Sequence, residues 1–374
     1  MKLIHLSDLH LGKRIHGYSM MEDQRYILEQ ILGIVENEKP EGVILAGDLY
    51  DKSIPPADAV RLFDWFLTEL SRRNLSVFAI SGNHDSAERI AFGSGLMSGK
   101  GVHLSPVYDG EVKKVELKDE YGPVYIWLLP FLKPVMVRQA LKEEKIEGYQ
   151  NAVETVIGRM DMDPSKRNVI VAHQFVTGAS LCESEEINVG GLDQIGAEVF
   201  ADFDYTALGH IHSPQRAGSD RIRYCGTPLK YSFSEAEQTK SVTVVELHEK
   251  GKVEIRTVPL TPLRDMRKIR GTYMELMSPS FYQAGNREDY MHITLTDEED
   301  IPDGLQKLRV VYPNLMQLTY DNLRTQSNQE ICVEEDVEQK SELELFEDFY
   351  RIQNNQGLSE EQTSYVMGLL ERLK

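Results

Sequence analysis

One arrangement of residues recurs five times before residue 213. A short apolar segment is followed, in most cases after a glycine, by side chains that bind metal ions. Short apolar runs bounded in this way are typical of buried strands. The carboxyl ends of parallel strands meet at one edge of a sheet, so we expect the polar groups to converge there. The segments and their polar groups are Leu3–Leu6 with Asp8 and His10, Val43–Ala46 with Asp48, Val77–Ile80 with Asn83 and His84, Val169–Ala172 with His173, and Tyr205–Leu208 with His210 and His212.

The types of ligand indicate a pair of catalytic metal ions. Carboxylate, amide and imidazole groups, with no thiolate among them, suit Mn²⁺, Fe²⁺ or Zn²⁺ in a catalytic site better than a structural zinc. These groups are too many for one ion and suit two ions that share a carboxylate, a centre that clamps a phosphoryl oxygen and generates hydroxide near neutral pH. Asp48, directly after Gly47, is the expected shared ligand. His84 is expected beside the ions without binding them, as a general acid.

Composition is that of a globular protein with room for two or three domains. The chain has 374 residues, of which 41% are hydrophobic and 27% charged. The first apolar run meets a charge at Asp8, and we find no apolar run of about 18 residues, so neither a signal peptide nor a membrane span is expected. Cys182, Cys225 and Cys332 are far apart and odd in number, which favours reduced thiols in a cytoplasmic protein.

The net charge of −19 at first argues against a nucleic-acid partner, because such binders usually carry a basic surface. Its distribution weakens that objection. Residues 296–374 hold 7 basic and 18 acidic residues, whereas residues 1–100 hold 11 and 14. Most of the excess negative charge therefore lies far in sequence from the ligand motifs, and bound divalent ions would offset acids within them.

The order of expected elements predicts an α/β fold of two stacked mixed β-sheets flanked by helices. Helices are expected at about 21–36, 57–73 and 87–97 between the first strands, and residues 135–160 look helical. Further strands are expected at 112–117, 124–129, 169–172, 206–208, 221–224 and 241–247. The helix at 57–73 carries Leu62 and Trp65 outside its main apolar stripe, and this second stripe fits either a dimer contact or packing under a neighbouring helix.

We divide the chain into a catalytic domain (1–265), a small α+β capping domain (266–325), an acidic linker (326–340) and a helical hairpin (341–374). In the capping domain we expect strands at 291–295 and 316–320 and a helix at 304–311. Ser359 and Gln362 have the spacing of a capping box, so they predict the start of the second hairpin helix. An apolar face with no core of its own favours a binding surface over packing on the catalytic domain. The residues expected to bind a partner are Leu345, Phe346, Phe349, Tyr365, Leu369 and Leu370.

Basic residues near the ligand motifs are candidates for phosphate contacts. Lys13 and Arg14 directly follow the first motif, and Lys52 and Arg89 lie near the next two. Lysine and arginine side chains make many of the phosphate contacts of DNA-binding proteins. A solvated loop is the other interpretation of these residues.

The ligand motifs occur along the chain in the order D-x-H, G-D-x-x-D, G-N-H-D, a single later histidine and G-H-x-H. In this order they resemble the motifs of the calcineurin-like metallophosphoesterase superfamily over about residues 1–230. A narrower resemblance is to the bacterial SbcD nuclease subunits, and with the tail it spans nearly the whole chain. It rests on His5–Gly12, Gly82–Ser86, Ala172–Phe175, Gly209–Gln215 and Tyr224–Phe233.

The resemblance implies a Mn²⁺-dependent nuclease of DNA repair, recombination and replication. Such an enzyme is an exonuclease on double-stranded DNA and an endonuclease on single-stranded or hairpin DNA, in the cytoplasm at the nucleoid. Its partner would be SbcC, an ATPase with a long coiled coil, in a heterotetramer built on a homodimer of this chain. One metal would bind Asp8, His10, Asp48 and His212, and the other Asp48, Asn83, His173 and His210. His84 would protonate the leaving oxygen, and Asp51 would orient His84.

Two other hypotheses stay open at the level of the sequence. A scaffold without activity would have lost metal ligands, and none is missing from the pattern here. A phosphodiesterase or phosphatase for small molecules would keep the ligands, but it has no evident need for a capping domain and a helical tail.

Overall fold

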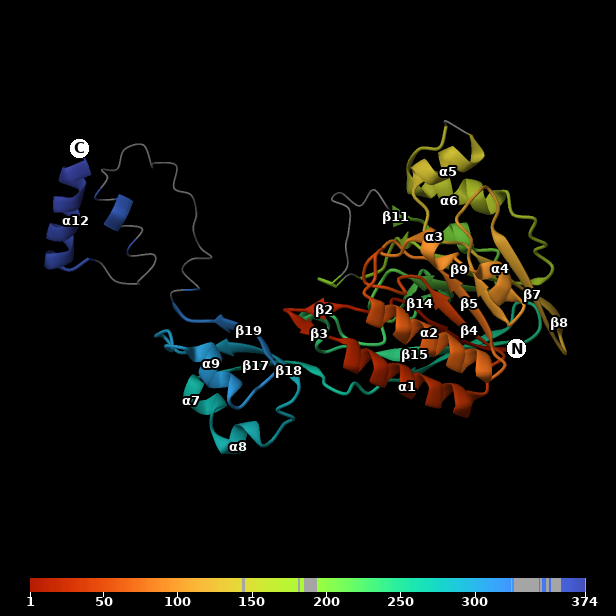
Figure 1. Ribbon diagram of the computed structural model, residues 1–374. Helices are drawn as coiled ribbons and strands as arrows, with labels where there is room; N and C mark the ends of the chain where they lie inside the picture. The colour runs from red at the N-terminus through yellow and green to blue at the C-terminus, as the bar shows by residue number, and fades with distance from the viewer. Residues whose placement is uncertain are drawn as a thin grey trace. The chain divides into compact units, whose positions relative to one another are not determined.

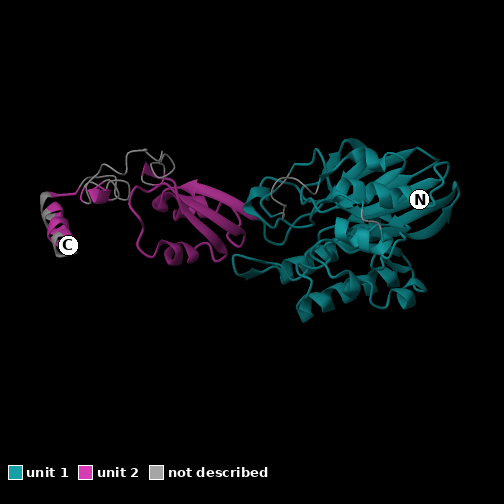
Figure 2. Cartoon of the chain, turned by 90° about the horizontal axis from the view of Figure 1, so that it is seen from above, with its two compact units in different colours: residues 1–265 teal, residues 266–374 magenta. Residues whose placement is uncertain are grey.

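The computed structural model describes residues 1–142, 145–180, 182–184, 194–323, 325, 343, 345–347, 350 and 358–373. The chain divides into two compact units, Met1–Asp265 and Met266–Lys374 (Figure 2). Within the described ranges, no helix is both long and apolar enough to cross a membrane. The expected linker at 326–340 lies outside the described residues.

The first sheet of unit 1 has a parallel centre and an antiparallel edge. Its strands β1, β4, β5 and β6 are parallel, β15 is antiparallel to β1, and β16 is antiparallel to β15. The strand order is β16 (Val253–Pro259), β15 (Ser241–Leu247), β1 (Lys2–Leu6), β4 (Gly42–Ala46), β5 (Ser76–Ile80) and β6 (Val102–Leu104).

Two long helices run side by side along this sheet, α1 (Met21–Glu38) and α2 (Ala57–Arg72) (Figure 1). Leu62 of α2 is buried, and the guanidinium of Arg25 in α1 lies 4.3 Å from the centre of the Trp65 ring. The second apolar stripe of α2 is thus in contact with α1, which supports the packing interpretation of that stripe.

The second sheet repeats the plan of the first. Its central strands β8, β9, β12 and β14 are parallel, and the edge strands β7 and β13 are antiparallel to their neighbours. Helices α5 (Pro134–Leu141) and α6 (Gly148–Gly158) contribute to the hydrophobic core on one face of this sheet. The strand order is β13 (Gln215–Ala217), β14 (Ser219–Tyr224), β12 (Tyr205–Gly209), β9 (Arg167–His173), β8 (Gly122–Leu128) and β7 (Lys113–Asp119).

The two sheets share one core. Leu3 and Phe78 of the first sheet are fully buried in one cluster with Val171 and Tyr205 of the second. The stacking confirms the expected α/β fold of two mixed sheets with flanking helices. It also brings the carboxyl ends of strands from both sheets to one place.

Unit 2 contains a three-stranded parallel sheet of β17 (Met266–Gly271), β18 (Tyr290–Leu295) and β19 (Leu315–Tyr320). Its core includes Leu276, Ile293 and Leu308. Its helices include α7 (Tyr273–Leu276), α8 (Pro279–Tyr282), α9 (Gly304–Arg309) and α12 (Glu360–Leu373).

Some expected elements were wrong in extent. The helix expected at 87–97 is broken into α3 (Ala87–Ile90) and α4 (Ser94–Ser98), because Gly93 takes a left-handed conformation (φ 72°). Lys142, also left-handed, ends α5, so the region 135–160 holds two helices. The expectation missed β16 and β17, which alternate exposed charged residues with partly buried apolar ones. The loop after the first motif contains the short pair β2 (Arg14–Ile15) and β3 (Tyr18–Ser19).

Candidate metal centre

The candidate ligands follow the carboxyl ends of five parallel strands. Asp8 and His10 follow β1, Asp48 follows β4 and Asn83 follows β5 in the first sheet. In the second sheet, His173 ends β9, while His210 and His212 follow β12. A site built in this way draws its ligands from both sheets.

The backbone of the ligand loops is held in an uncommon conformation. Positive φ angles occur at Asp8 (52°), His10 (43°), Asp48 (49°) and His210 (101°). Few residues other than glycine adopt such angles. Backbone strain of this kind clusters at functional sites, where the surrounding structure maintains it.

Glycines next to the ligands leave room for ligand side chains. A Cβ atom at Gly47, where φ is 86°, would lie 2.3 Å from Nδ1 of His173. A Cβ atom at Gly82 would lie 2.1 Å from Oδ1 of Asp48. Atoms other than hydrogen do not approach so closely without bonding, so any side chain at either glycine would displace a candidate ligand.

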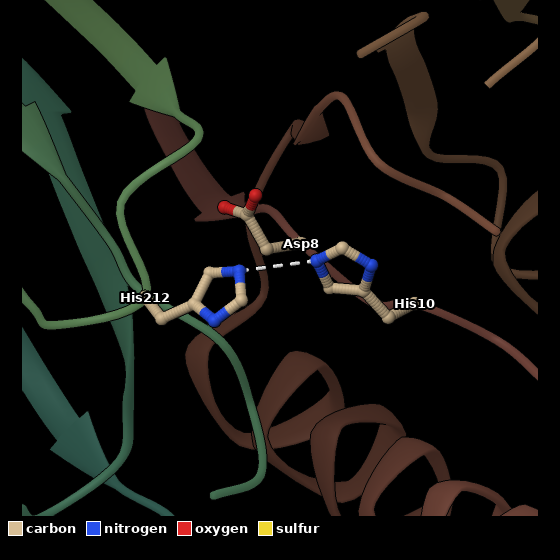
Figure 3. A group of neighbouring side chains, drawn as sticks. All are labelled: Asp8, His10 and His212. Atoms are coloured by element: carbon tan, nitrogen blue, oxygen red, sulfur yellow. Dashed lines mark hydrogen bonds between the residues drawn. The ribbon is translucent and has the colours of Figure 1, made fainter. Parts of the chain in front are cut away.

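One cluster of ligand atoms comes from Asp8, His10 and His212 (Figure 3). The Nε2 atoms of His10 and His212 lie 3.1 Å apart, and each of the three residues offers an atom within 4.8 Å of the other two. The Asp8 carboxylate accepts hydrogen bonds from the Ser7 hydroxyl and from the backbone N–H of His210. These contacts fix the carboxylate toward the two rings.

A second cluster surrounds the side-chain oxygen of Asn83. This Oδ1 atom lies 3.0 Å from Nε2 of His173 and 2.9 Å from Nδ1 of His210. Nδ1 of His173 donates to the carbonyl of Ala46 at 2.8 Å, which leaves its Nε2 to face the cluster. Oδ2 of Asp48 lies 3.3 Å from that Nε2 atom.

Asp48 lies between the two clusters. Its Oδ2 atom is 3.8 Å from Nε2 of His10 as well as 3.3 Å from Nε2 of His173. The side chain is 2% exposed, and its other oxygen accepts the backbone N–H of His84. The donor atoms of these clusters, oxygen and imidazole nitrogen, are those that first-row divalent metals prefer. The residues therefore fit two such ions that share Asp48.

Burial sets the protonation of most of the rings. It lowers the pKa of His10 and of His212 well below the ordinary imidazole value, and lowers that of His210 to about 3. Neutral imidazole is the form that binds a metal. Burial also raises the pKa of the Asp8 carboxyl to about 7, although the positive charge of His173 opposes this shift.

His173 and Asp48 form an ion pair, with Nε2 of the ring 3.3 Å from Oδ2 of the carboxylate. Burial alone would lower the pKa of His173, but the neighbouring Asp48 carboxylate outweighs it and raises the pKa to about 9. In the same way, burial would raise the pKa of Asp48, but the charge of His173 holds it below its usual range. A metal ion that binds here must displace the proton of His173.

His84 lies at the edge of both clusters. Its Nδ1 atom donates to the backbone carbonyl of Asp51 at 3.1 Å, and its Nε2 atom lies 4.0 Å from Oδ2 of Asp48. Asp51 contacts His84 through its main-chain carbonyl, and a role for Asp51 in orienting this ring stays a prediction. The carboxylate of Asp51 instead pairs with Lys13 at 2.8 Å and lies 3.8 Å from Nδ1 of His10.

The candidate phosphate-binding residues are near the ligand loops in sequence but differ in their contacts. Lys13 is held by Asp51, and its ammonium lies 5.5 Å from the centre of the Tyr231 ring. Arg14 donates to the carbonyl of Gly17 at 2.5 Å. Lys52 and Arg89 are exposed.

The sequence reasoning gave no role to Asp85, although it belongs to the G-N-H-D motif. Its carboxylate accepts the backbone N–H groups of Leu49 (3.0 Å), Tyr50 (3.0 Å) and Gly82 (2.9 Å), and so ties two ligand loops together. Burial and then the charge of Asp48 raise the pKa of Asp85 to about 6. Its position within the motif could have revealed this function.

Tyr231 was also missed as a support of the first ligand loop. Its hydroxyl donates to the carbonyl of Leu9 at 2.6 Å and accepts from the Gln24 amide at 3.0 Å. The same amide donates to the carbonyl of His10 at 2.8 Å. No local pattern could have revealed these contacts, because Gln24 and Tyr231 are 207 residues apart.

The candidate partner-binding residues belong to unit 2. Tyr365 is 70% exposed and Leu369 42%, both on α12, while Leu370 is partly buried. The expected capping box is present, since the backbone N–H of Ser359 donates to Gln362 and that of Gln362 to Ser359. Leu345 and Phe346 are partly exposed, and Phe349 lies outside the described residues.

Comparisons with known proteins agree with this geometry. The calcineurin-like phosphoesterase family matches residues 1–214, and the type 5 capsule protein repressor C-terminal domain matches residues 262–354. The SbcD subunit of the nuclease SbcCD from Staphylococcus epidermidis is 31% identical over 377 residues, covering 99% of this chain and 98% of that protein.

Solved structures with weaker similarity include a dimetal phosphatase from Danio rerio and a protein of Thermus thermophilus. Each is 13% identical to this chain, with TM-scores of 0.45 and 0.39, and they cover 70% and 68% of it. The alignments cover 99% and 98% of those chains. These likenesses are too weak to support a conclusion, but the family match and the Staphylococcus relative are sufficient. The chain is a metal-dependent phosphoesterase of the calcineurin-like superfamily and belongs, within it, to the family of SbcD nuclease subunits.

Proposed function

We propose that this protein is a Mn²⁺-dependent DNA nuclease of an SbcCD-type repair and recombination complex. It would act as an exonuclease on double-stranded DNA and as an endonuclease on single-stranded or hairpin DNA. The observation that carries the proposal is the meeting of both ligand clusters around Asp48, with His84 beside them. The long match to a nuclease subunit favours DNA over small phosphodiesters as the substrate.

The residues of the two clusters would have separate roles in phosphodiester cleavage. Two divalent ions, when bound, polarise the phosphate and activate the attacking water. One ion would be held by Asp8, His10 and His212. The other would be held by Asn83, His173 and His210, and Asp48 would bind both ions. Mn²⁺ suits this mixture of oxygen and nitrogen donors.

His84 would supply the proton to the leaving oxygen. The carbonyl of Asp51 accepts from Nδ1–H of His84, so the ring is oriented with Nε2 toward the clusters. A proton on Nε2 could then pass to the alkoxide as the phosphorus–oxygen bond breaks.

Unit 2 offers a polar sheet face that suits contacts with DNA. Lys268 and Arg270 of β17 are exposed and stand beside His292 and Thr294 of β18. The hydroxyl of Thr319 in β19 is hydrogen-bonded to both of these residues of β18, at 2.9 Å from Nε2 of His292 and 3.0 Å from the hydroxyl of Thr294. Basic and hydroxyl side chains of this kind contact phosphate oxygens. We assign residues 266–325 a role in DNA recognition.

The partner would be a coiled-coil ATPase of the SbcC type, bound by the exposed apolar residues of the C-terminal hairpin. A homodimer would complete the heterotetramer. Phe92 and Leu96, which are 84% and 87% exposed, give unit 1 an apolar surface that such a dimer could cover.

The test compares three substrates with purified protein and Mn²⁺, with and without the ATPase. We expect end-labelled duplex DNA to be shortened, a hairpin to be opened and bis-p-nitrophenyl phosphate to be hydrolysed. EDTA should abolish all three activities. His84→Gln serves as the control for contaminating nucleases. Hydrolysis of the small diester with both DNAs left intact, even in the complex, would instead identify an enzyme for small phosphodiesters.

A further inference from the structure

The two ring nitrogens of His212 have different surroundings. Nε2 lies 3.1 Å from Nε2 of His10 in the first ligand cluster, while the other ring nitrogen points away from that ring (Figure 3). That second atom, Nδ1, lies 2.7 Å from the hydroxyl oxygen of Ser184. Ser184 is on the chain between β10 (Phe175–Val176) and β11 (Gln194–Ile195), far in sequence from either histidine.

Ser184, which is itself partly buried, is the first member of a polar network whose other side chains are buried. Its hydroxyl donates to Oε1 of Glu235 at 2.6 Å, and Oε2 of Glu235 pairs with the ammonium of Lys240, also at 2.6 Å. The side chains of Glu235 and Lys240 are 0% and 4% exposed. Lys240 also donates to the backbone carbonyl of His212 at 2.9 Å, so this network contacts both the ring and the backbone of His212.

The chemistry of these groups fixes the direction of each hydrogen bond. A carboxylate paired with an ammonium only accepts, so the proton between Ser184 and Glu235 belongs to the serine hydroxyl. That hydroxyl has then used its one proton, and its oxygen can only accept from Nδ1–H of His212. A neutral imidazole with a proton on Nδ1 carries its lone pair on Nε2, the atom that faces His10 and Asp8.

We propose that Ser184, Glu235 and Lys240 are positioning residues that hold His212 as the Nδ1–H tautomer, with Nε2 ready to bind a metal ion. Contacts of this kind fix the orientation of a metal-binding histidine and raise its affinity for the metal. The inference deepens the proposed function, since it concerns the ion that His212 would hold. It assigns a function to Glu235 and Lys240, which lie between the two family matches, 1–214 and 262–354.

The first test reads the tautomer directly. The full chain, labelled with ¹⁵N at histidine and freed of metal, is studied by long-range ¹H–¹⁵N NMR, and loss of one ring in His212→Gln assigns the resonances. We expect Nδ1 of His212 to be protonated and Nε2 to be bare. In Ser184→Ala the ring should sample both tautomers, whereas Ser184→Thr, which restores the hydroxyl, should keep the native one.

The second test measures Mn²⁺ alone by isothermal titration calorimetry. Ser184→Ala should weaken one of the two Mn²⁺ equivalents about 10- to 100-fold, the usual effect of removing an indirect support of a metal ligand. Ser180→Ala is the matched control, because Ser180 is exposed on the same segment. Circular dichroism confirms that each variant is folded.

The outcomes separate this inference from the proposed function. A bare Nδ1 in the native protein, or unchanged Mn²⁺ affinity in folded Ser184→Ala, would overturn it. Neither experiment contains DNA. If the native protein binds two Mn²⁺ ions but leaves DNA intact, the nuclease proposal is refuted. The proposed role of Ser184 in positioning His212 would not be affected by that result.

Discussion

Asp48 and His84 lie within 4.0 Å of each other but should give opposite results when they are replaced. Asp48→Ala removes a carboxylate that lies 3.8 Å from Nε2 of His10 in one cluster and 3.3 Å from Nε2 of His173 in the other, so we expect loss of both metals and of activity. His84→Gln should keep two metals and lower turnover about 10²- to 10⁴-fold, the usual contribution of a general acid. Elemental analysis beside turnover of the aryl diester tests this. Two metals in Asp48→Ala, or a lost metal in His84→Gln, would contradict these roles.

Protons and metals should compete for the same pair of residues. The pKa of His173 is raised to about 9 beside the Asp48 carboxylate, and burial raises that of Asp8 to about 7. Below these values the two groups hold protons that a metal ion must displace, so the affinity for Mn²⁺ should rise as the pH increases from about 6 to 9. Calorimetry in buffers of different ionisation enthalpy should detect protons released on Mn²⁺ binding at pH 7.5. Affinity that is independent of pH would contradict the ion pair of His173 and Asp48.

Lys13 and Arg14 allow DNA binding to be separated from cleavage. Replacing both by alanine should reduce affinity for duplexes of any sequence and lower the salt dependence of binding, because phosphate contacts release counterions. Hydrolysis of the small diester should change little. Fluorescence anisotropy at several salt concentrations measures the effect, and equal affinity would show that these side chains do not reach the phosphates.

Gly47, after strand β4, and Gly33, in helix α1, allow a matched comparison. Gly47→Ala would place a Cβ 2.3 Å from Nδ1 of His173 at a φ of 86°, and should cost about 2 kcal/mol or more of stability as well as metal binding. Gly33 lies in α1, where an added Cβ meets no atom of the described structure within 4 Å. Gly33→Ala should stabilise by up to about 1 kcal/mol. Urea denaturation and metal analysis test both. Equal effects would mean that the turn after β4 tolerates a side chain.

The sequence predicted best those elements whose pattern is local. Strand β4 is an unbroken apolar run that ends in glycine and aspartate, so both the strand and its ligand were evident. The break between α3 and α4 was missed because a single glycine, Gly93, decides it. Ser184 and Glu235 could not be found at all, since only the folded chain brings them to His212.

We expect that the C-terminal segment can be removed without loss of the catalytic unit's fold or activity. A chain that ends near Lys340 should remain folded, bind two metals and cleave the aryl diester, because its candidate ligands all lie within residues 1–265. It should no longer co-purify with its ATPase, because Tyr365 and Leu369 are removed. Full-length protein with Gly368→Ala is a useful control, since an added Cβ there meets no described atom within 4 Å. A complex that survives the truncation would refute the role of the tail.

The candidate ligands come from both sheets, and they run along the sequence from Asp8 to His212. The residues that we propose to position His212 extend further, to Lys240. During synthesis on the ribosome, the first three strand ends emerge well before β9 and β12 exist. Neither metal site can therefore be complete until His210 and His212 have been made, when more than half of the chain has been synthesised. Products of interrupted translation would carry several of the ligand motifs and still be unable to cut, so the order of translation itself delays the appearance of a hydrolytic enzyme.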